Sequence, residues 1–127
     1  MIRYHYARHL SLPAPFVNVA LFCPQTGSRV ADLPAQIDSG ADRTVLPGRV
    51  VLQLGLVEDG RLLFQGFAAE VIELPIFLVE VHIHDLPPIM VRAALGEHEP
   101  HILLGRDVLN RLEILFRGPA GEVVVNP

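Results

Sequence analysis

The sequence predicts an all-β domain with one short helix near its C-terminus. Apolar and polar residues alternate along several short segments, which is the pattern of half-buried strands. Eleven prolines and ten glycines interrupt a chain that is 50% hydrophobic, as expected for strands joined by turns. Near residue 105 the period changes, because Val108, Leu109 and Leu112 recur at helical spacing. These three observations favour a β fold with a single short helix.

The expected elements follow one another without a repeat or a linker. Residues 16–23 and 29–37 form one predicted hairpin, and residues 61–84 form a longer one with Gly66 near its tip. Residues 48–56 fit a short helix about as well as a strand. Further strands are expected at 44–46, 87–95, 102–104 and on both sides of the turn at 118–121. We divide the chain into an N-terminal arm or strand, residues 1–14, and a single domain, residues 15–127.

Length and charge exclude several classes of protein. A chain of 127 residues is long enough for one domain with its own core. The net charge of −4 provides no basic surface for nucleic acid. No stretch reaches the roughly 18 uninterrupted apolar residues of a membrane span. The single cysteine, Cys23, excludes an internal disulfide and a zinc–thiolate cluster. We therefore expect a soluble, cytoplasmic protein with no nucleic-acid or membrane partner.

One acidic segment, AQIDSGADRTVLP at residues 35–47, points to chemistry. Asp38 ends an apolar strand, where burial of a carboxylate is costly, and small residues follow it at once. Gly40 permits a tight turn, and its amide can donate to the acid. Two such acids placed face to face cannot both ionise cheaply, so they share one proton. The protonated acid can polarise a carbonyl while the ionised one activates water.

The segment around Asp38 resembles the active-site loop of retropepsin-type aspartic proteases. Asp38-Ser39-Gly40-Ala41 follows Ile37 and precedes Thr44-Val45-Leu46. A second segment, Leu103-Leu104-Gly105-Arg106-Asp107, resembles the family's C-terminal motif, in which two apolar residues and a glycine enter a short helix. The two motifs lie about 65 residues apart, as they do in the family. The resemblance covers roughly residues 15–125.

This resemblance implies a fold and a role for each matching residue. The implied fold is a closed β-barrel or sandwich with a ψ-shaped active-site loop, a flap hairpin and one short C-terminal helix. Asp38 would be catalytic, and Ser39, Gly40 and Ala41 would form its loop. Structural support would come from Asp42, Thr44, Leu104, Gly105 and Arg106. A partly buried Asp42–Arg106 ion pair would brace the loop, so that loss of Arg106 would cost several kcal/mol. The flap would include Gln65, Gly66, Phe67 and Ala68, although this tip has fewer glycines than retroviral flaps.

The Asp-Ser-Gly triplet occurs once, which predicts a homodimer. The second carboxylate must come from another copy related by a two-fold axis. The N-terminal segment and residues 121–127 are candidates for an intersubunit sheet, as terminal strands are in the family. The predicted function is hydrolysis of peptide or protein substrates with apolar side chains about the scissile bond. No cofactor and no metal are implied.

Two other functions remain open from the sequence. A catalytically silent dimerisation or peptide-binding module could keep the same fold, and the glycine-poor hairpin tip is consistent with it. A metal-binding β-protein is the third reading, because His82 and His84 would share a face of one strand, with His98 and His101 nearby. The triplet itself could also be an ordinary Asx turn after a strand.

Overall fold

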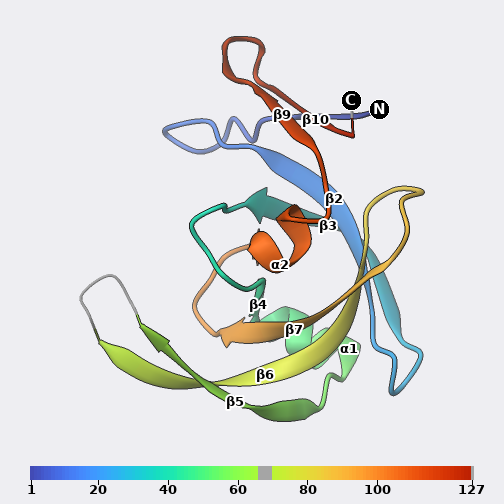
Figure 1. Cartoon of the computed structure of the whole chain (residues 1–127), viewed down its shortest axis with the longest axis vertical. Helices are drawn as coiled ribbons and strands as arrows, with labels where there is room; N and C mark the ends of the chain where they lie inside the picture. The colour runs from blue at the N-terminus through green and yellow to red at the C-terminus, as the bar shows by residue number, and fades with distance from the viewer. Residues whose placement is uncertain (66–69, 127) are drawn as a thin grey trace.

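The computed structural model describes residues 1–65 and 70–126. Strands make up most of this part of the chain, and Figure 1 shows their order. The strands are β1 (Ile2–His5), β2 (Phe16–Phe22), β3 (Arg29–Ile37), β4 (Val45–Pro47), β5 (Glu58–Gln65), β6 (Val71–His82), β7 (Ile89–Gly96), β8 (Ile102–Leu104), β9 (Ile114–Arg117) and β10 (Glu122–Val125). The helices are α1 (Gly48–Leu54), α2 (Arg106–Leu109) and a 3₁₀ turn, η1 (Gly118–Ala120). The prediction of an all-β fold is confirmed.

Six strands close into a barrel. Their order is β2-β3-β8-β4-β7-β6, and pairing of β2 with β6 joins the two ends of the sheet. Strand β5 adds to the outer edge of β6, so the β5–β6 hairpin extends beyond the barrel (Figure 1). Closure joins the two ends of the sheet, and the side chains that point inward form the core. Leu21, Leu46 and Leu104 are among the fully buried core residues.

Residues 48–54, for which the sequence allowed either a helix or a strand, form helix α1. Val50 and Leu54 are four residues apart and both are buried, which places them on the same helical face. Gly55 ends the helix in the left-handed conformation with φ of 64°, and its N–H donates to the Leu52 carbonyl at 3.1 Å. Burial of this apolar face therefore favours the helix over a strand in residues 48–54.

The two ends of the chain form a separate sheet of order β1-β10-β9. Strand β10 pairs with β1 on one side and with β9 on the other, both antiparallel. The sequence suggested that both terminal segments were available to a second subunit. That expectation is wrong for β10, because neighbours within the same chain occupy both of its edges. Among the described residues, the outer edges of β1 and β9 are the two edges of this sheet that remain for a further strand.

Strand β8 lies between β3 and β4, which are consecutive along the chain. It pairs parallel to β3, with Ile37 opposite Leu104, and antiparallel to β4 through Leu103 and Val45. The loop 38–44, which joins β3 to β4, must therefore cross the C-terminal end of β8. This crossing is the ψ-shaped arrangement expected from the sequence, and it places residues 38–44 against residues 105–107.

Candidate active site

The loop 38–44 is held to the end of β8 by backbone hydrogen bonds. Asp38 N–H donates to the Leu104 carbonyl at 3.0 Å, which continues the β3–β8 pairing by one residue. Arg106 N–H donates to the Ala41 carbonyl at 2.9 Å, and Asp107 N–H donates to the Asp42 carbonyl at 3.3 Å. Two N–H groups in the first turn of α2, which have no partner within the helix, thus donate hydrogen bonds to two carbonyls of the loop.

Asp38 lies at the start of this loop in a tight turn. Its side chain is half-buried, and its Oδ1 accepts the Gly40 N–H at 3.1 Å. The Asp38 carbonyl also accepts the Ala41 N–H at 3.2 Å. An N–H donated to a carboxylate stabilises the ionised form of the acid. Ser39 and Gly40 are exposed, and the Ser39 hydroxyl makes no hydrogen bond to residues 1–65 or 70–126.

Gly105 permits the loop to cross β8 at close range. A Cβ at this position would lie 2.4 Å from the Arg43 carbonyl carbon and 2.8 Å from the Thr44 nitrogen. The Gly105 backbone is extended, with φ of −87° and ψ of −177°, a conformation open to any residue. Space, and not backbone conformation, therefore requires glycine where the loop passes.

A buried hydrogen-bond network joins the far end of the loop to helix α2. Thr44 is fully buried, and its Oγ1 donates to Asp107 Oδ1 at 2.8 Å. Its backbone N–H donates to the same carboxylate at 3.0 Å. The Thr44 hydroxyl also accepts the Gly105 N–H at 3.2 Å. This network satisfies buried groups that would otherwise be costly to desolvate.

Sequence reasoning missed the partner of Thr44. In the sequence, Asp107 stands out only as the last residue of the motif at residues 103–107. The Asp107 carboxylate also accepts the Val108 N–H at 2.9 Å, so it bonds to the first turn of α2 as well as to the loop. An acid two residues after a buried glycine was the available signal. Only the ψ crossing reveals that Thr44 lies opposite it.

Replacing Thr44 by Val is expected to lower the free energy of unfolding by about 1–3 kcal/mol. Valine has nearly the same shape, but it leaves the Gly105 N–H without its acceptor and removes a donor to Asp107. Chemical denaturation monitored by circular dichroism would measure the change. Thr26→Val is the matched control, because the Thr26 hydroxyl hydrogen-bonds to Ser28 in an exposed turn, and its loss should cost no more than about 0.5 kcal/mol. Equal stability of both variants would contradict the role given to this network.

Asp42 and Arg106 form the ion pair that the sequence suggested, but the pair is exposed. Arg106 Nη2 contacts Asp42 Oδ1, and the two side chains are 44% and 82% exposed. Arg106 Nη1 also donates to the Ser39 carbonyl at 2.8 Å, which links α2 to the tip of the loop. The expectation of a partly buried pair is therefore wrong, and an exposed pair of this kind contributes about 0.2–1 kcal/mol.

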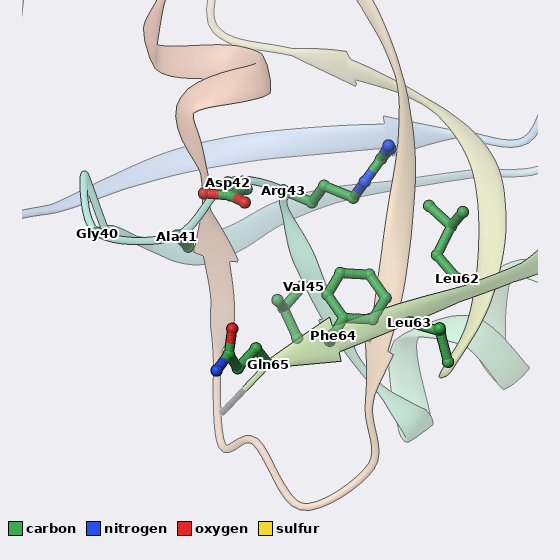
Figure 2. A pocket seen from close by; sticks show the side chains of 9 residues that line it. All are labelled: Gly40, Ala41, Asp42, Arg43, Val45, Leu62, Leu63, Phe64 and Gln65. Carbon is green, nitrogen blue, oxygen red and sulfur yellow. The ribbon is translucent and has the colours of Figure 1, made fainter. Parts of the chain in front are cut away.

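A cavity of about 620 Å³ separates the loop from the β5–β6 hairpin. Figure 2 shows the side chains around it, from Gly40 to Val45 on one side and from strand β5 on the other. The lining residues are Gly40, Ala41, Asp42, Arg43, Val45, Leu62, Leu63, Phe64 and Gln65. Gln65, one of the four residues expected in the flap, lines this cavity. The other three, Gly66, Phe67 and Ala68, lie outside the described residues.

The histidines do not form the arrangement that a metal site would need. His82 ends β6, whereas His84 lies in the following turn with φ of 49°. They therefore do not alternate along one strand as expected. His101 packs edge-on against Phe16, and burial, followed by the charges of His9 and Arg49, lowers the pKa of its imidazole. Throughout residues 1–65 and 70–126, no three His, Cys, Asp or Glu side chains are grouped to hold a metal ion. Nor does this part of the chain contain a helix of sufficient length and apolar character to cross a membrane.

Comparison with known proteins gives a clear answer for the fold. No family model and no curated protein matches the sequence. A retropepsin-like aspartic protease from Rickettsia conorii superposes with a TM-score of 0.63 at 14% identity, over 96% of this chain and 86% of that one. EIAV protease in complex with an inhibitor gives a TM-score of 0.52 at 22% identity, over 77% and 86% of the two chains. The retroviral protease-like domain of Ddi1 from Leishmania major gives 0.53 at 18% identity, over 87% and 88%.

The topology and the structural matches agree. Most of this chain superposes on each of the three structures, although its sequence is at most 22% identical to theirs. Such a likeness identifies the fold. The chain has the fold of the retropepsin-like aspartic proteases.

Proposed function

We propose that the protein is an aspartic endopeptidase that is active as a homodimer. The observation that carries this proposal is the position of Asp38. The ψ crossing fixes its backbone through Leu104, and the exposed residues Ser39 and Gly40 follow it. A cavity large enough for a peptide segment lies directly beyond Gly40 and Ala41. Asp38 itself is not among the residues that line this cavity, so the catalytic space would form only when a second copy is added.

The proposed reaction needs two carboxyl groups and one water molecule. Asp38 and its symmetry mate share one proton, because two ionised acids in contact repel each other. The ionised acid takes a proton from water, whose oxygen attacks the peptide carbonyl carbon, while the protonated acid donates a hydrogen bond to the carbonyl oxygen. The tetrahedral intermediate then breaks its C–N bond, and the leaving nitrogen takes a proton from a carboxyl group. The hairpin tip around residues 65–68 is proposed to cover the substrate.

Cleavage of an unbiased peptide library between about pH 3 and pH 7 tests this function, together with inhibition by a statine-type transition-state mimic. The alternative, a silent peptide-binding module, has one observation in its favour, the single glycine in the hairpin tip at residues 65–69. Binding of library peptides without any cleavage and without inhibitor binding would favour that alternative.

We infer that the second copy docks on the outer edge of β9. The Glu113 carbonyl accepts the Asn126 N–H at 2.7 Å, so the backbone groups of residue 113 face β10. Because these directions alternate along a strand, the N–H and C=O groups of Ile114 and Phe116 face away from β10. Leu115 and Phe116 are 47% and 50% exposed, which is unusual for two large apolar neighbours on an edge strand.

The alternation restricts how β9 can pair with its copy. Two residues can form a hydrogen-bonded antiparallel pair only if the backbone N–H and C=O groups of both point toward the shared edge. Ile114 can therefore lie opposite the partner's Phe116. In that register Leu115 meets its own copy on the two-fold axis. The same register places Glu113 opposite Arg117 twice, once on each side of the axis. Apolar contact at the centre and opposite charges at both ends both support this pairing.

Replacing Leu115 by Arg is expected to raise the dimer dissociation constant at least about 100-fold, because like charges opposite each other cost several kcal/mol. Sedimentation equilibrium would measure it. Leu52→Arg is the matched control, since Leu52 is 83% exposed on α1, away from this edge. The register has its own test, because Glu113→Arg and Arg117→Glu should each weaken the dimer and the double variant should restore it. A Leu115→Arg protein that remains dimeric would contradict the proposed interface.

A further inference from the structure

Arg43 brings a positive charge to the cavity beside Asp38. It follows Asp42 directly, is half-buried and lines the cavity. Its one hydrogen bond among the described residues is long, with Nη1 donating to the Arg92 carbonyl at 3.4 Å. Figure 2 shows its side chain extended away from Asp42, toward the side of the cavity on which Leu62 lies.

No acid in the described part of the chain compensates this charge. Arg43 makes no ion pair within residues 1–65 and 70–126, whereas the nearby Arg92 is paired with Asp59 at 2.8 Å. Asp42, the one acidic residue of the lining, is engaged by Arg106. The remaining lining residues are neutral, and residues 66–69 contain no acidic side chain. Among the described residues, the lining therefore combines apolar side chains with one cation that no acid pairs.

We propose that this cavity selects an acidic side chain of the substrate, and that Arg43 determines this specificity. A glutamate of an extended peptide would pair its carboxylate with the Arg43 guanidinium, whose planar fork suits a carboxylate. Its methylene groups would contact apolar walls such as Val45 and Phe64. This inference rests on the proposed function, because it concerns the substrate of the same site. It also amends the purely apolar preference that the sequence suggested.

An apolar substrate side chain is the competing occupant. It would pack against Val45, Leu62 and Phe64, and it could also cover the aliphatic stem of Arg43. It would, however, displace water from the guanidinium without supplying an acceptor, which carries a desolvation cost. A glutamate supplies that acceptor and keeps the apolar contacts of its stem. The balance of these effects favours the acidic side chain.

The test compares peptide pairs that differ only in Glu or Gln at one position near the scissile bond. For the wild type, kcat/KM should favour Glu about tenfold at one such position, as expected for a charge-assisted hydrogen bond. Arg43→Gln should abolish this ratio, and Arg43→Glu should reverse it. Arg111→Gln, which removes an exposed arginine outside the cavity, is the matched control and should keep the ratio. The preference should disappear below about pH 4, where the peptide glutamate becomes protonated while arginine stays charged.

Binding of the same peptides to the Asp38→Asn protein separates this inference from the proposed function. If the Asp38→Asn protein binds Glu peptides more tightly than Gln peptides, and Arg43→Gln removes this difference, the inference is supported. This holds even if the wild type cleaves nothing, because lack of cleavage would overturn only the proposed hydrolysis. Cleavage with equal rates for Glu and Gln peptides at every position would overturn the acidic preference and leave the protease function intact. Absence of both cleavage and binding for all peptides would overturn both. A preference for apolar side chains over both Glu and Gln would identify the competing occupant.

Discussion

The Asp38→Asn protein is expected to lose peptide cleavage by about 10⁴-fold or more, because neither subunit then has a carboxylate to take a proton from water. Asparagine has the same shape as aspartate, and its side-chain oxygen can still accept the Gly40 N–H that now lies 3.1 Å from Asp38 Oδ1. Fold and dimerisation should therefore persist. Steady-state hydrolysis of a library-derived peptide measures the loss, and thermal unfolding and sedimentation establish that the protein is intact.

Asp32→Asn is the matched control for this substitution. Asp32 is exposed on the same strand, β3, outside the loop, and its φ of 57° is a conformation that asparagine tolerates well. It should retain wild-type activity. Retention of cleavage by Asp38→Asn would contradict the proposed mechanism.

Mixing experiments test whether both copies of Asp38 are needed. If one site uses both carboxyl groups, an equal mixture of wild-type and Asp38→Asn subunits at exchange equilibrium should keep about a quarter of the wild-type activity, since only dimers with two wild-type subunits are active. If each subunit has its own site, about half should remain. The second result would contradict a shared site.

Replacing Gly105 by Ala is expected to destabilise the fold by about 3 kcal/mol or more. The added methyl would overlap the Arg43 backbone, whose carbonyl carbon lies 2.4 Å from the new Cβ position and whose oxygen lies 2.5 Å away. A backbone cannot move aside as the end of a flexible side chain can. Relief of the overlap would require the loop 38–44 to lift from β8, which would also displace Asp38. Chemical denaturation and kcat/KM measured on the same preparation would register both effects.

Gly48→Ala provides the comparison for Gly105→Ala. Gly48 opens helix α1, and a Cβ there would lie 3.8 Å from the nearest atoms, which belong to Glu97. This contact is ordinary, and alanine favours helix, so stability should stay within about 1 kcal/mol of the wild type. A Gly105→Ala protein as stable as Gly48→Ala would show that the loop does not pass as closely as described.

The local parts of the site could be predicted from sequence because each is defined by adjacent residues. An acid followed by Ser39 and Gly40 produces a tight turn after a strand, and Leu103-Leu104-Gly105 produces a buried strand that stops abruptly. The presence of two motifs at a suitable spacing pointed to the fold more strongly than either alone. The sequence did not decide between a helix and a strand for residues 48–56, because their apolar residues fit the period of either element. Burial against the barrel decides in favour of the helix.

The remaining features depend on contacts between distant segments. Thr44 meets Asp107 only because β8 lies between β3 and β4. The Asp42–Arg106 pair was foreseen, but its exposure was not, since exposure depends on what else covers the loop. In the same way, pairing of β1 with β10 within the chain removed an edge that the sequence had seemed to leave for a partner.

By itself, then, the sequence determined the all-β fold, the acid loop at Asp38 and the glycine at 105, because turn chemistry and strand patterning act over a few neighbouring residues. The tertiary structure decided which groups these elements meet. It made Asp107 a half-buried acceptor for Thr44, left the outer edge of β9 unpaired among the described residues and placed Arg43 in the cavity lining without an ion pair there. The physical reason is that burial, hydrogen-bond partners and charge compensation are set by segments about 60 residues apart in the chain, such as Thr44 and Asp107.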